Sequence, residues 1–307
     1  MLRRTLTGRR ILLAAVAALA VATSHAKEAR PPKWSRDVRD TFFDDARQAL
    51  TGERPDYGRS SAVSTPIVTA SKTASAAWSQ IIASETIETE IKRVAQSLDK
   101  SVSTPSAFKG SGFKDARRDL SELALLFAVT AQYDGDARWK DTAAGLRTAF
   151  AQAAASAKVG SDATYREASA RKQELADLIR GGRPQVPKAD AAVDDWSQVA
   201  ARPPLMQRLN IAHQDQLTKW LADDATFHRH HADVAHEAQL VALIAAIIHR
   251  QKYEYWDDET FAGYADELQQ AASDVAAAAA ANNYPRAQQA IGRATNACAN
   301  CHEGYRG

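Results

Sequence analysis

The chain is poor in the residues that build disulfide-rich or sheet-rich proteins. Its 307 residues include only two cysteines, two methionines, 14 glycines and 10 prolines. The two cysteines lie close together near the C-terminal end, which leaves none for the disulfide framework that exported domains often carry. Valine, isoleucine and threonine do not gather in alternating runs, whereas alanine is abundant. We therefore predict an all-α protein.

Several functional classes also lack their usual residues. No basic patch is interleaved with aromatic side chains, so nucleic-acid binding is not expected. No nucleophile–base pair and no pair of carboxylates stands out by its spacing, and Glu237 beside His236 is interpreted as an ordinary exposed turn. The sequence accordingly predicts no enzyme. A content of 45% hydrophobic and 25% charged residues is typical of a globular chain.

The N-terminus has the composition of a secretory signal peptide. Four arginines precede an apolar stretch at 11–22, and Ser24 and Ala26 provide the small residues of a cleavage site. The apolar stretch is too short to span a bilayer comfortably. We therefore predict cleavage of residues 1–26, a periplasmic location and no stable membrane insertion. An uncleaved membrane anchor is the alternative.

Charge is unevenly distributed once residues 1–26 are set aside. Residues 27–189 contain 26 basic and 21 acidic residues, a net charge of +5. Residues 190–307 contain 9 basic and 16 acidic residues, a net charge of −7. A basic half joined to an acidic half can orient a protein on its partner, although an ordinary solvated surface explains both halves as well.

Two segments of the chain resemble each other at a nearly constant offset. Trp-Ser-Gln-Ile-Ile at 78–82 recurs as Trp-Ser-Gln-Val-Ala at 196–200, 118 residues later. A second match, 117 residues apart, pairs Glu-Leu-Ala-Leu-Leu-Phe at 122–127 with Gln-Leu-Val-Ala-Leu-Ile at 239–244. Chance similarity between alanine-rich helices is the alternative, but the constant offset favours duplication.

The repeat predicts two tandem antiparallel four-helix bundles, at 71–184 and 185–307, after an extension at 27–70 that contains one helix. Proline in a first turn and acidic residues at a helix start indicate where several helices begin. The expected helices cover about 78–98, 112–133, 138–158 and 162–180 in the first bundle, and about 203–221, 232–249, 257–282 and 285–304 in the second.

The last predicted helix ends in the motif Cys298-Ala299-Asn300-Cys301-His302. On a helix, positions i, i+3 and i+4 share one face, so two thiols can form thioethers with a haem while the imidazole binds its iron. We predict one covalent haem c, with His302 as the proximal ligand of the iron. A thioredoxin-like motif would need a preceding strand, a zinc site would need further ligands, and a disulfide would strain the helix.

These residues resemble the class II cytochromes c, the group of cytochrome c′ and its low-spin relatives. As in that family, the motif stands on the last of four helices, and an aromatic and a basic residue follow it, here Tyr305 and Arg306. The resemblance covers 196–307 well. It reaches 78–180 only as a degenerate copy, which has neither cysteine nor histidine at 181–185 and implies a first bundle without haem. The tandem arrangement is similar to that of cytochrome-like proteins of the planctomycete type.

The resemblance also implies roles for residues around the haem. Tyr305 and Arg306 would border it, Arg306 near the proximal face, and Arg202 would pair with a haem propionate. The alternative for Arg306 is a cation that stabilises the C-terminal end of a helix, and the alternative for Arg202 is a surface arginine. The family takes its distal residue from the first helix, four residues after an arginine, which here is Met206. A thioether is a suitable axial ligand, but methionine also fills cores.

Histidines offer alternatives to Met206 or a separate metal site. Three single histidines compete for the iron, namely His213, His236 and His249. Each is more commonly a packing or surface residue than a ligand. A separate group of three histidines could bind a metal ion in the exported protein, although a solvated helix start explains these histidines better. This group consists of His228, His230 and His231.

These features predict periplasmic single-electron transfer with a redox protein that the sequence does not identify. An open distal side, with Met206 unbound or displaced, would instead give a protein that binds or senses nitric oxide or carbon monoxide. A mainly structural protein, whose basic first bundle docks a partner, is a third alternative. Class II bundles often dimerise through their first helices, so a homodimer stays open unless the first bundle occupies that surface.

Overall fold

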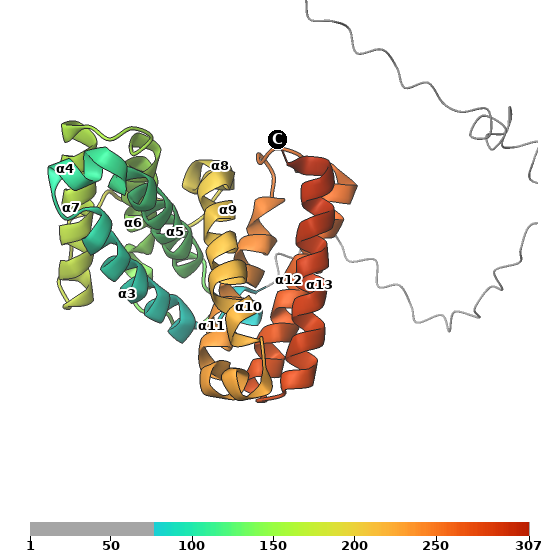
Figure 1. The fold of residues 1–307 in the computed structure, drawn as a ribbon. Coiled ribbons are helices and arrows are strands. Elements are labelled where there is room, and N and C mark those ends of the chain that lie inside the picture. Colours follow the sequence, from blue (N-terminus) through green and yellow to red (C-terminus); the bar gives the residue numbers. More distant parts are fainter. Residues whose placement is uncertain (1–76, 307) are drawn as a thin grey trace, which may run out of the picture. The chain divides into compact units, whose positions relative to one another are not determined.

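The computed structural model describes residues 77–306, and the predictions for residues 1–26 and 27–70 lie outside this range. Within it all regular structure is helical, which confirms the all-α prediction. The described residues belong to one compact unit whose apolar core is continuous from the first bundle to the second. Figure 1 shows the helices of this unit coloured along the sequence.

The first bundle (teal to green in Figure 1) contains four helices close to the expected bounds. α5 packs against α3 and α6, and α7 completes the bundle by packing against α6 and α3. The segment at 78–80 forms a separate 3-10 turn before α3, so the first expected helix starts later than predicted. The helices are α3 (Ser84–Ser101), α5 (Phe113–Ala131), α6 (Lys140–Ser156) and α7 (Asp162–Ile179).

A tight connection leads from α3 into α5. It consists of the single turn α4 (Pro105–Ala107) and the π-helical segment η2 (Phe108–Gly112). At Gly112 the chain passes so close to the end of α3 that an added Cβ would overlap the carbonyl oxygen of Ser101. Only glycine permits this approach, because it has no Cβ.

The second bundle (yellow to red in Figure 1) has a composite first helix. This helix and α11 pack together, α11 packs on α12, and α12 packs on α13. The elements are α8 (Trp196–Val199), α9 (Arg202–Asn210), η3 (Ile211–Leu217), α10 (Thr218–Trp220), α11 (Asp224–Ile248), α12 (Glu259–Ala280) and α13 (Tyr284–Tyr305).

The second bundle differs from the sequence prediction at two points. α11 begins at Asp224 rather than near 232, because Asp223 Oδ1 accepts a hydrogen bond from the Thr226 N–H (2.8 Å) and caps the earlier start. The first helix is also not uniformly α-helical, since η3 in its middle is π-helical. Such π-helical insertions are frequent at functional sites.

The two bundles meet where α5 of the first packs against α9 of the second, and through paired tryptophans. The ring centroids of Trp78 and Trp196 lie 5.5 Å apart. The guanidinium of Arg250 covers both rings, at 4.6 and 5.0 Å from their centroids. Gln239 Oε1 accepts a hydrogen bond from the Ala83 N–H (2.8 Å) across the same boundary. The first bundle therefore covers part of α9, and the possible homodimer stays a prediction.

Equivalent tyrosines make equivalent contacts in the two bundles. The Tyr133 hydroxyl donates a hydrogen bond to the carbonyl of Ile82 (3.0 Å), and the Tyr253 hydroxyl donates one to the carbonyl of Ala200 (2.7 Å). Ile82 and Ala200 occupy matching positions of the repeated pentapeptide. These contacts are what duplication leads one to expect, although duplication itself and the boundary between 71–184 and 185–307 stay predictions.

α11 is the one described helix that is long and apolar enough to cross a membrane. Of its most apolar window, 72% is buried against the other helices. A core helix of a bundle has the same length and composition, because it must be apolar on most of its surface.

Candidate haem site

The C-terminal motif lies on the last turns of α13, beside an apolar cavity. Asn283 caps this helix by accepting a hydrogen bond from the Arg286 N–H (3.1 Å). From there α13 continues unbroken through Cys298 and Cys301, which are half-buried, to the exposed His302. Cys298 faces the interior of the bundle, where it lines the cavity. The cavity is lined by residues of all its helices, among them Leu209, Val241, Leu268, Val275, Ile291 and Ala294.

The environment of the two thiols does not favour disulfide exchange. Burial raises the pKa of Cys298 to about 11. Burial also raises the pKa of Cys301, although the charge of Arg202 acts in the opposite direction. Disulfide exchange requires a thiolate and therefore a lowered pKa, so the environment argues against the thioredoxin-like alternative. Two thiols and an imidazole beside an apolar cavity fit the attachment of a haem.

The first helix of the second bundle runs antiparallel to α13, which brings Met206 to the level of the motif. At one end, Arg202 is close enough to Cys301 for its charge to lower the pKa of the thiol. Farther along, Nε2 of His213 lies within hydrogen-bonding distance of Oγ1 of Thr295 (2.8 Å). Met206 lies between these two levels, half-buried and packed against the core.

Arg202 occupies an aromatic environment that the sequence did not predict. Its guanidinium lies 4.9, 5.6 and 5.9 Å from the ring centroids of Phe261, Tyr255 and Tyr253. It also donates a hydrogen bond to the carbonyl of Glu254. Burial lowers the pKa of Arg202, and its Nε is buried without a hydrogen-bond partner. An unsatisfied guanidinium N–H beside the motif fits a propionate oxygen better than it fits a plain surface arginine.

Tyr305 joins this aromatic group, whereas Arg306 does not. The Tyr305 hydroxyl donates a hydrogen bond to Oδ2 of Asp258 (2.9 Å), the residue that caps α12. The Tyr305 ring also meets those of Tyr255 and Phe261 at 5.1 and 5.2 Å. Tyr305 thus ties the end of α13 to the start of α12. Arg306 is exposed beyond the end of α13, and the contact of either residue with a haem stays a prediction.

Of the three competing histidines, only His213 lines the cavity. Burial lowers the pKa of His213, which favours the neutral form of its imidazole. His236 instead faces the first bundle, and Nδ1 of His249 lies 3.0 Å from the carbonyl oxygen of Ala245 at the end of α11.

The histidine group near 230 lies inside α11, not before it. Nδ1 of His228 is 2.7 Å from Oδ1 of Asn282, whereas Nδ1 of His230 is 3.3 Å from Oδ2 of Asp233. These histidines therefore bind separate neighbours. Among residues 77–306, the group of side chains with metal-ligand spacing is a different one.

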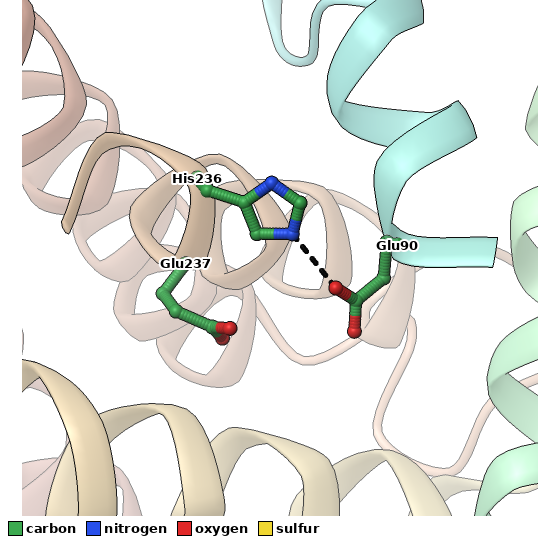
Figure 2. A group of neighbouring side chains, drawn as sticks. All are labelled: Glu90, His236 and Glu237. Carbon is green, nitrogen blue, oxygen red and sulfur yellow. Dashed lines mark hydrogen bonds and ion pairs between the residues drawn. The ribbon is translucent and has the colours of Figure 1, made fainter. Parts of the chain in front are cut away.

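A buried ionic cluster joins the two bundles, and the sequence analysis did not single it out. At its centre, Arg208 is 5% exposed. Its Nε donates to Glu122 Oε1 (2.6 Å), and its Nη2 donates to Glu90 Oε1 (2.9 Å) and Glu237 Oε2 (2.8 Å). His236 Nε2 meets the other oxygen of Glu90 at 2.7 Å (Figure 2). Glu237 and His236 are thus buried in α11, so their interpretation as an exposed turn was wrong.

Two carboxyl groups of this cluster have pKa values that shift in opposite directions. Burial raises the pKa of Glu122 well above its usual value, and the neighbouring Glu90 raises it further, despite the charge of Arg208. Burial also acts on Glu90, but the hydrogen bond from His236 and the charge of Arg208 lower its pKa to about 2. The pKa values of the two carboxyl groups thus shift in opposite directions, because burial favours the neutral form of Glu122 whereas His236 and Arg208 favour the charged form of Glu90.

Glu90, His236 and Glu237 have the donor types of a divalent-metal site. Their ligand atoms lie within 4.8 Å of one another (Figure 2). Arg208 already donates to both of these carboxylates, so its guanidinium supplies the positive charge that a metal would bring. The cluster is therefore best described as an arginine-centred ionic cluster. The sequence clue was a charged residue inside an apolar helical stripe, since Glu90 stands among Ile87, Ile91 and Val94.

The comparison with known proteins agrees with the C-terminal motif. Residues 223–306 match the family model described as cytochrome c′, a stretch that spans α11, α12 and α13. No curated protein and no solved structure matches the chain at a significant level. The match excludes the first bundle and α9, so Arg202 and Met206 lie outside it. Residues 223–306 are thus similar to the cytochrome c′ family, a similarity that supports a c-type haem protein.

Proposed function

We propose that the chain is an exported monohaem cytochrome that transfers single electrons in the periplasm. Its haem would be bound covalently through Cys298 and Cys301, with His302 and Met206 as axial ligands. The observation that carries the proposal is the alignment of α9 with α13. It brings a thioether to the level of a haem-attachment motif, within a domain of the cytochrome c′ type.

The residues of this chain have distinct tasks in the proposed site. The haem supplies a reversible one-electron couple, and a methionine ligand raises its reduction potential. The thioethers would hold the haem in place. The apolar side chains around the cavity exclude water. Solvation therefore changes little between the oxidised and the reduced haem. Arg202 binds a propionate through its unsatisfied Nε and thereby neutralises a charge that burial would make costly.

Optical spectra of the haem-loaded protein test the axial ligands. The oxidised wild type should show a low-spin spectrum with the weak red band of methionine-bound ferric haem. Met206→Leu should abolish this band while keeping the volume of the side chain. Leu205→Met is the matched control, since it adds a thioether next to Met206 on the same helix. A high-spin wild-type spectrum that Met206→Leu does not change would exclude Met206 as a ligand.

A second candidate function is the binding of nitric oxide or carbon monoxide at an open iron. The observation in its favour is the apolar cavity beside Cys298, which suits a small uncharged diatomic molecule. Titration of the reduced protein with carbon monoxide separates the two functions. Immediate binding by the wild type would favour the second, whereas binding only after Met206→Leu would favour electron transfer.

Export is a separate part of the proposal. Because the predicted signal peptide ends at Ala26, the mature protein should begin at Lys27. N-terminal sequencing of the haem-containing protein from a periplasmic extract measures this directly. An intact Met1 in membrane-bound protein would favour the uncleaved anchor.

A further inference from the structure

We propose that a positively charged redox protein docks on the loop between α11 and α12 and on the last turn of α13. We call this region the acidic aromatic surface. The inference rests on the proposed function, to which it adds the docking site and the charge of the partner. The surface consists of Glu254, Tyr255, Trp256, Asp257, Glu259 and Glu303.

Two neighbouring aromatic side chains are unusually exposed here. Tyr255 is 38% exposed and Trp256 is 45% exposed. Among residues 77–306, the only other large hydrophobic side chain with comparable exposure is Val159, in the first bundle. Aromatic residues are enriched at the centres of protein–protein interfaces, where they supply contact area at low entropic cost. This pair is therefore a candidate interface centre.

Acidic side chains surround the aromatic pair. Asp257, Glu259 and Glu303 are exposed, and no ion pair within the described part of the chain involves them. Glu254 is also exposed, and its Oε2 lies 3.6 Å from Nη1 of Arg202. The exposed cations nearby are fewer, namely Lys252 and Arg306. An acidic rim around an aromatic centre attracts a basic partner by electrostatic steering.

The surface is connected to both helices that carry the proposed iron ligands. The rings of Tyr255 and Tyr305 lie 5.1 Å apart, and Tyr305 follows His302 by three residues on α13. On the other side, Arg202 of α9 donates a hydrogen bond to the carbonyl of Glu254. In Figure 1 this orange loop lies next to the C-terminal end of α13. A protein that covers Trp256 would thus lie beside the haem motif.

The loop is also held in a fixed and uncommon conformation. Lys252 and Tyr255 have φ angles of 80° and 62°, in the left-handed region that residues with a Cβ rarely adopt. The backbone is secured by hydrogen bonds from the Trp256 N–H to the Tyr253 carbonyl (3.3 Å) and from the Asp258 N–H to the Tyr255 carbonyl (3.1 Å). A preorganised surface loses less entropy on binding.

The equivalent loop of the first bundle lacks these properties. Between α5 and α6, Trp139 is only half-buried but is covered by Arg138, whose guanidinium lies 4.7 Å from the ring centroid. Asp136 and Asp141 are exposed there too, but the cations Arg138 and Lys140 stand at the positions that match Tyr255 and Asp257. The acidic aromatic surface therefore belongs to the bundle that carries the haem motif.

Electron exchange with a basic cytochrome c as the probe protein tests the surface. The haem-loaded protein would be reduced and mixed with the oxidised probe at low and at high ionic strength. Asp257→Asn with Glu259→Gln should slow exchange by about three- to tenfold at low ionic strength, and the difference should disappear at high ionic strength. Trp256→Ala should slow exchange at both. A neutral small-molecule oxidant should react equally with all variants.

A matched control removes two acids from the equivalent end of the first bundle. Asp136→Asn with Asp141→Asn changes the net charge by the same amount at exposed positions. If this control slows exchange with the probe as much as the surface variant does, docking depends only on net charge and the inference is overturned.

Binding of the probe, measured separately by biolayer interferometry, distinguishes docking from electron transfer. Binding that the surface variants weaken, in a protein that exchanges no electrons even with the small oxidant, would support the surface and overturn the proposed function. Electron exchange with the small oxidant, together with probe binding that no surface variant weakens, would support the function and overturn the surface.

Discussion

The two bundles share one helical plan but fill their interiors differently. In the first bundle, Phe108, Phe127 and Phe150 are fully buried, and the rings of Phe127 and Phe150 stack at 5.5 Å. In the second bundle, the buried residues of α12 and α13 are mostly alanines, and an apolar cavity lies between the helices. Protein interiors are close-packed, so aromatic side chains and a haem cannot occupy the same volume.

This difference explains why one bundle is expected to hold a haem and the other is not. α7 ends at Ile179, and the residues that follow, Arg180 and Gly181, include neither a thiol nor an imidazole. Gly181 adopts a φ of 95°, which ends the helix. At the equivalent position of the second bundle, α13 remains helical through Cys298 and Cys301. The absence of an attachment motif and the filled interior are thus two separate reasons why no haem is expected in the first bundle.

Placing an aromatic side chain in the interior of the second bundle, as in the first bundle, should have the largest effect. Ala294 lines the cavity and is 2% exposed, so Ala294→Phe places a ring where the haem is proposed to lie. We expect the haem content per protein to fall about tenfold relative to the wild type. Pyridine haemochrome absorbance per protein measures it. Ala153→Phe, in the buried face of α6, is the control and should keep its haem. A fully loaded Ala294→Phe protein would contradict the proposed haem position.

Removing the central cation of the ionic cluster should have the next largest effect. Arg208→Met leaves Glu90 and Glu237 buried without their partner, which costs about 3–5 kcal/mol of unfolding free energy. Urea denaturation followed by circular dichroism measures this cost. The control is Arg93→Met, because Arg93 contacts Glu237 at 3.5 Å from a 40% exposed position and should cost about 1 kcal/mol or less. Equal losses for the two variants would show that the cluster does not hold the bundles together.

The pH dependence of stability should be the smallest of these effects. The pKa of Glu90 is lowered to about 2, so its contribution to stability is present above the unfolded value near 4.5 and is lost as the pH falls toward 2. The pKa of Glu122 is raised, so its contribution is present at low pH and is lost as the pH rises through the folded value. Glu90→Gln should flatten the acid side of a plot of melting temperature against pH, and Glu122→Gln the alkaline side.

Thermal unfolding monitored by circular dichroism provides that plot. The exposed Glu259→Gln, remote from the cluster on α12, is the reference for an ordinary carboxyl group. An alkaline side that Glu122→Gln does not alter would mean that the pKa of Glu122 is not raised in the folded protein.

Features that depend on neighbours along the chain could be predicted well. Helical period, proline at first turns and acidic caps placed most helices within a few residues. The haem attachment that the spacing of Cys298, Cys301 and His302 indicates stays a prediction. The early start of α11 was not predicted, because Asp223 is one of several acidic residues in that segment. Only the hydrogen bond that it accepts from the Thr226 N–H shows that Asp223 is the cap.

Features that join distant segments required the tertiary structure. Glu90 and His236 are 146 residues apart, and their pairing exists only because α3 lies against α11. The aromatic setting of Arg202 likewise depends on a loop 52 residues away, whose left-handed turns no local pattern reveals. The sequence by itself determined the helices and the haem motif, since these follow from the spacing of residues along one helix. Which charges are buried together and which aromatic rings face solvent was decided by the packing of the bundles, because burial and pairing depend on partners remote in the chain.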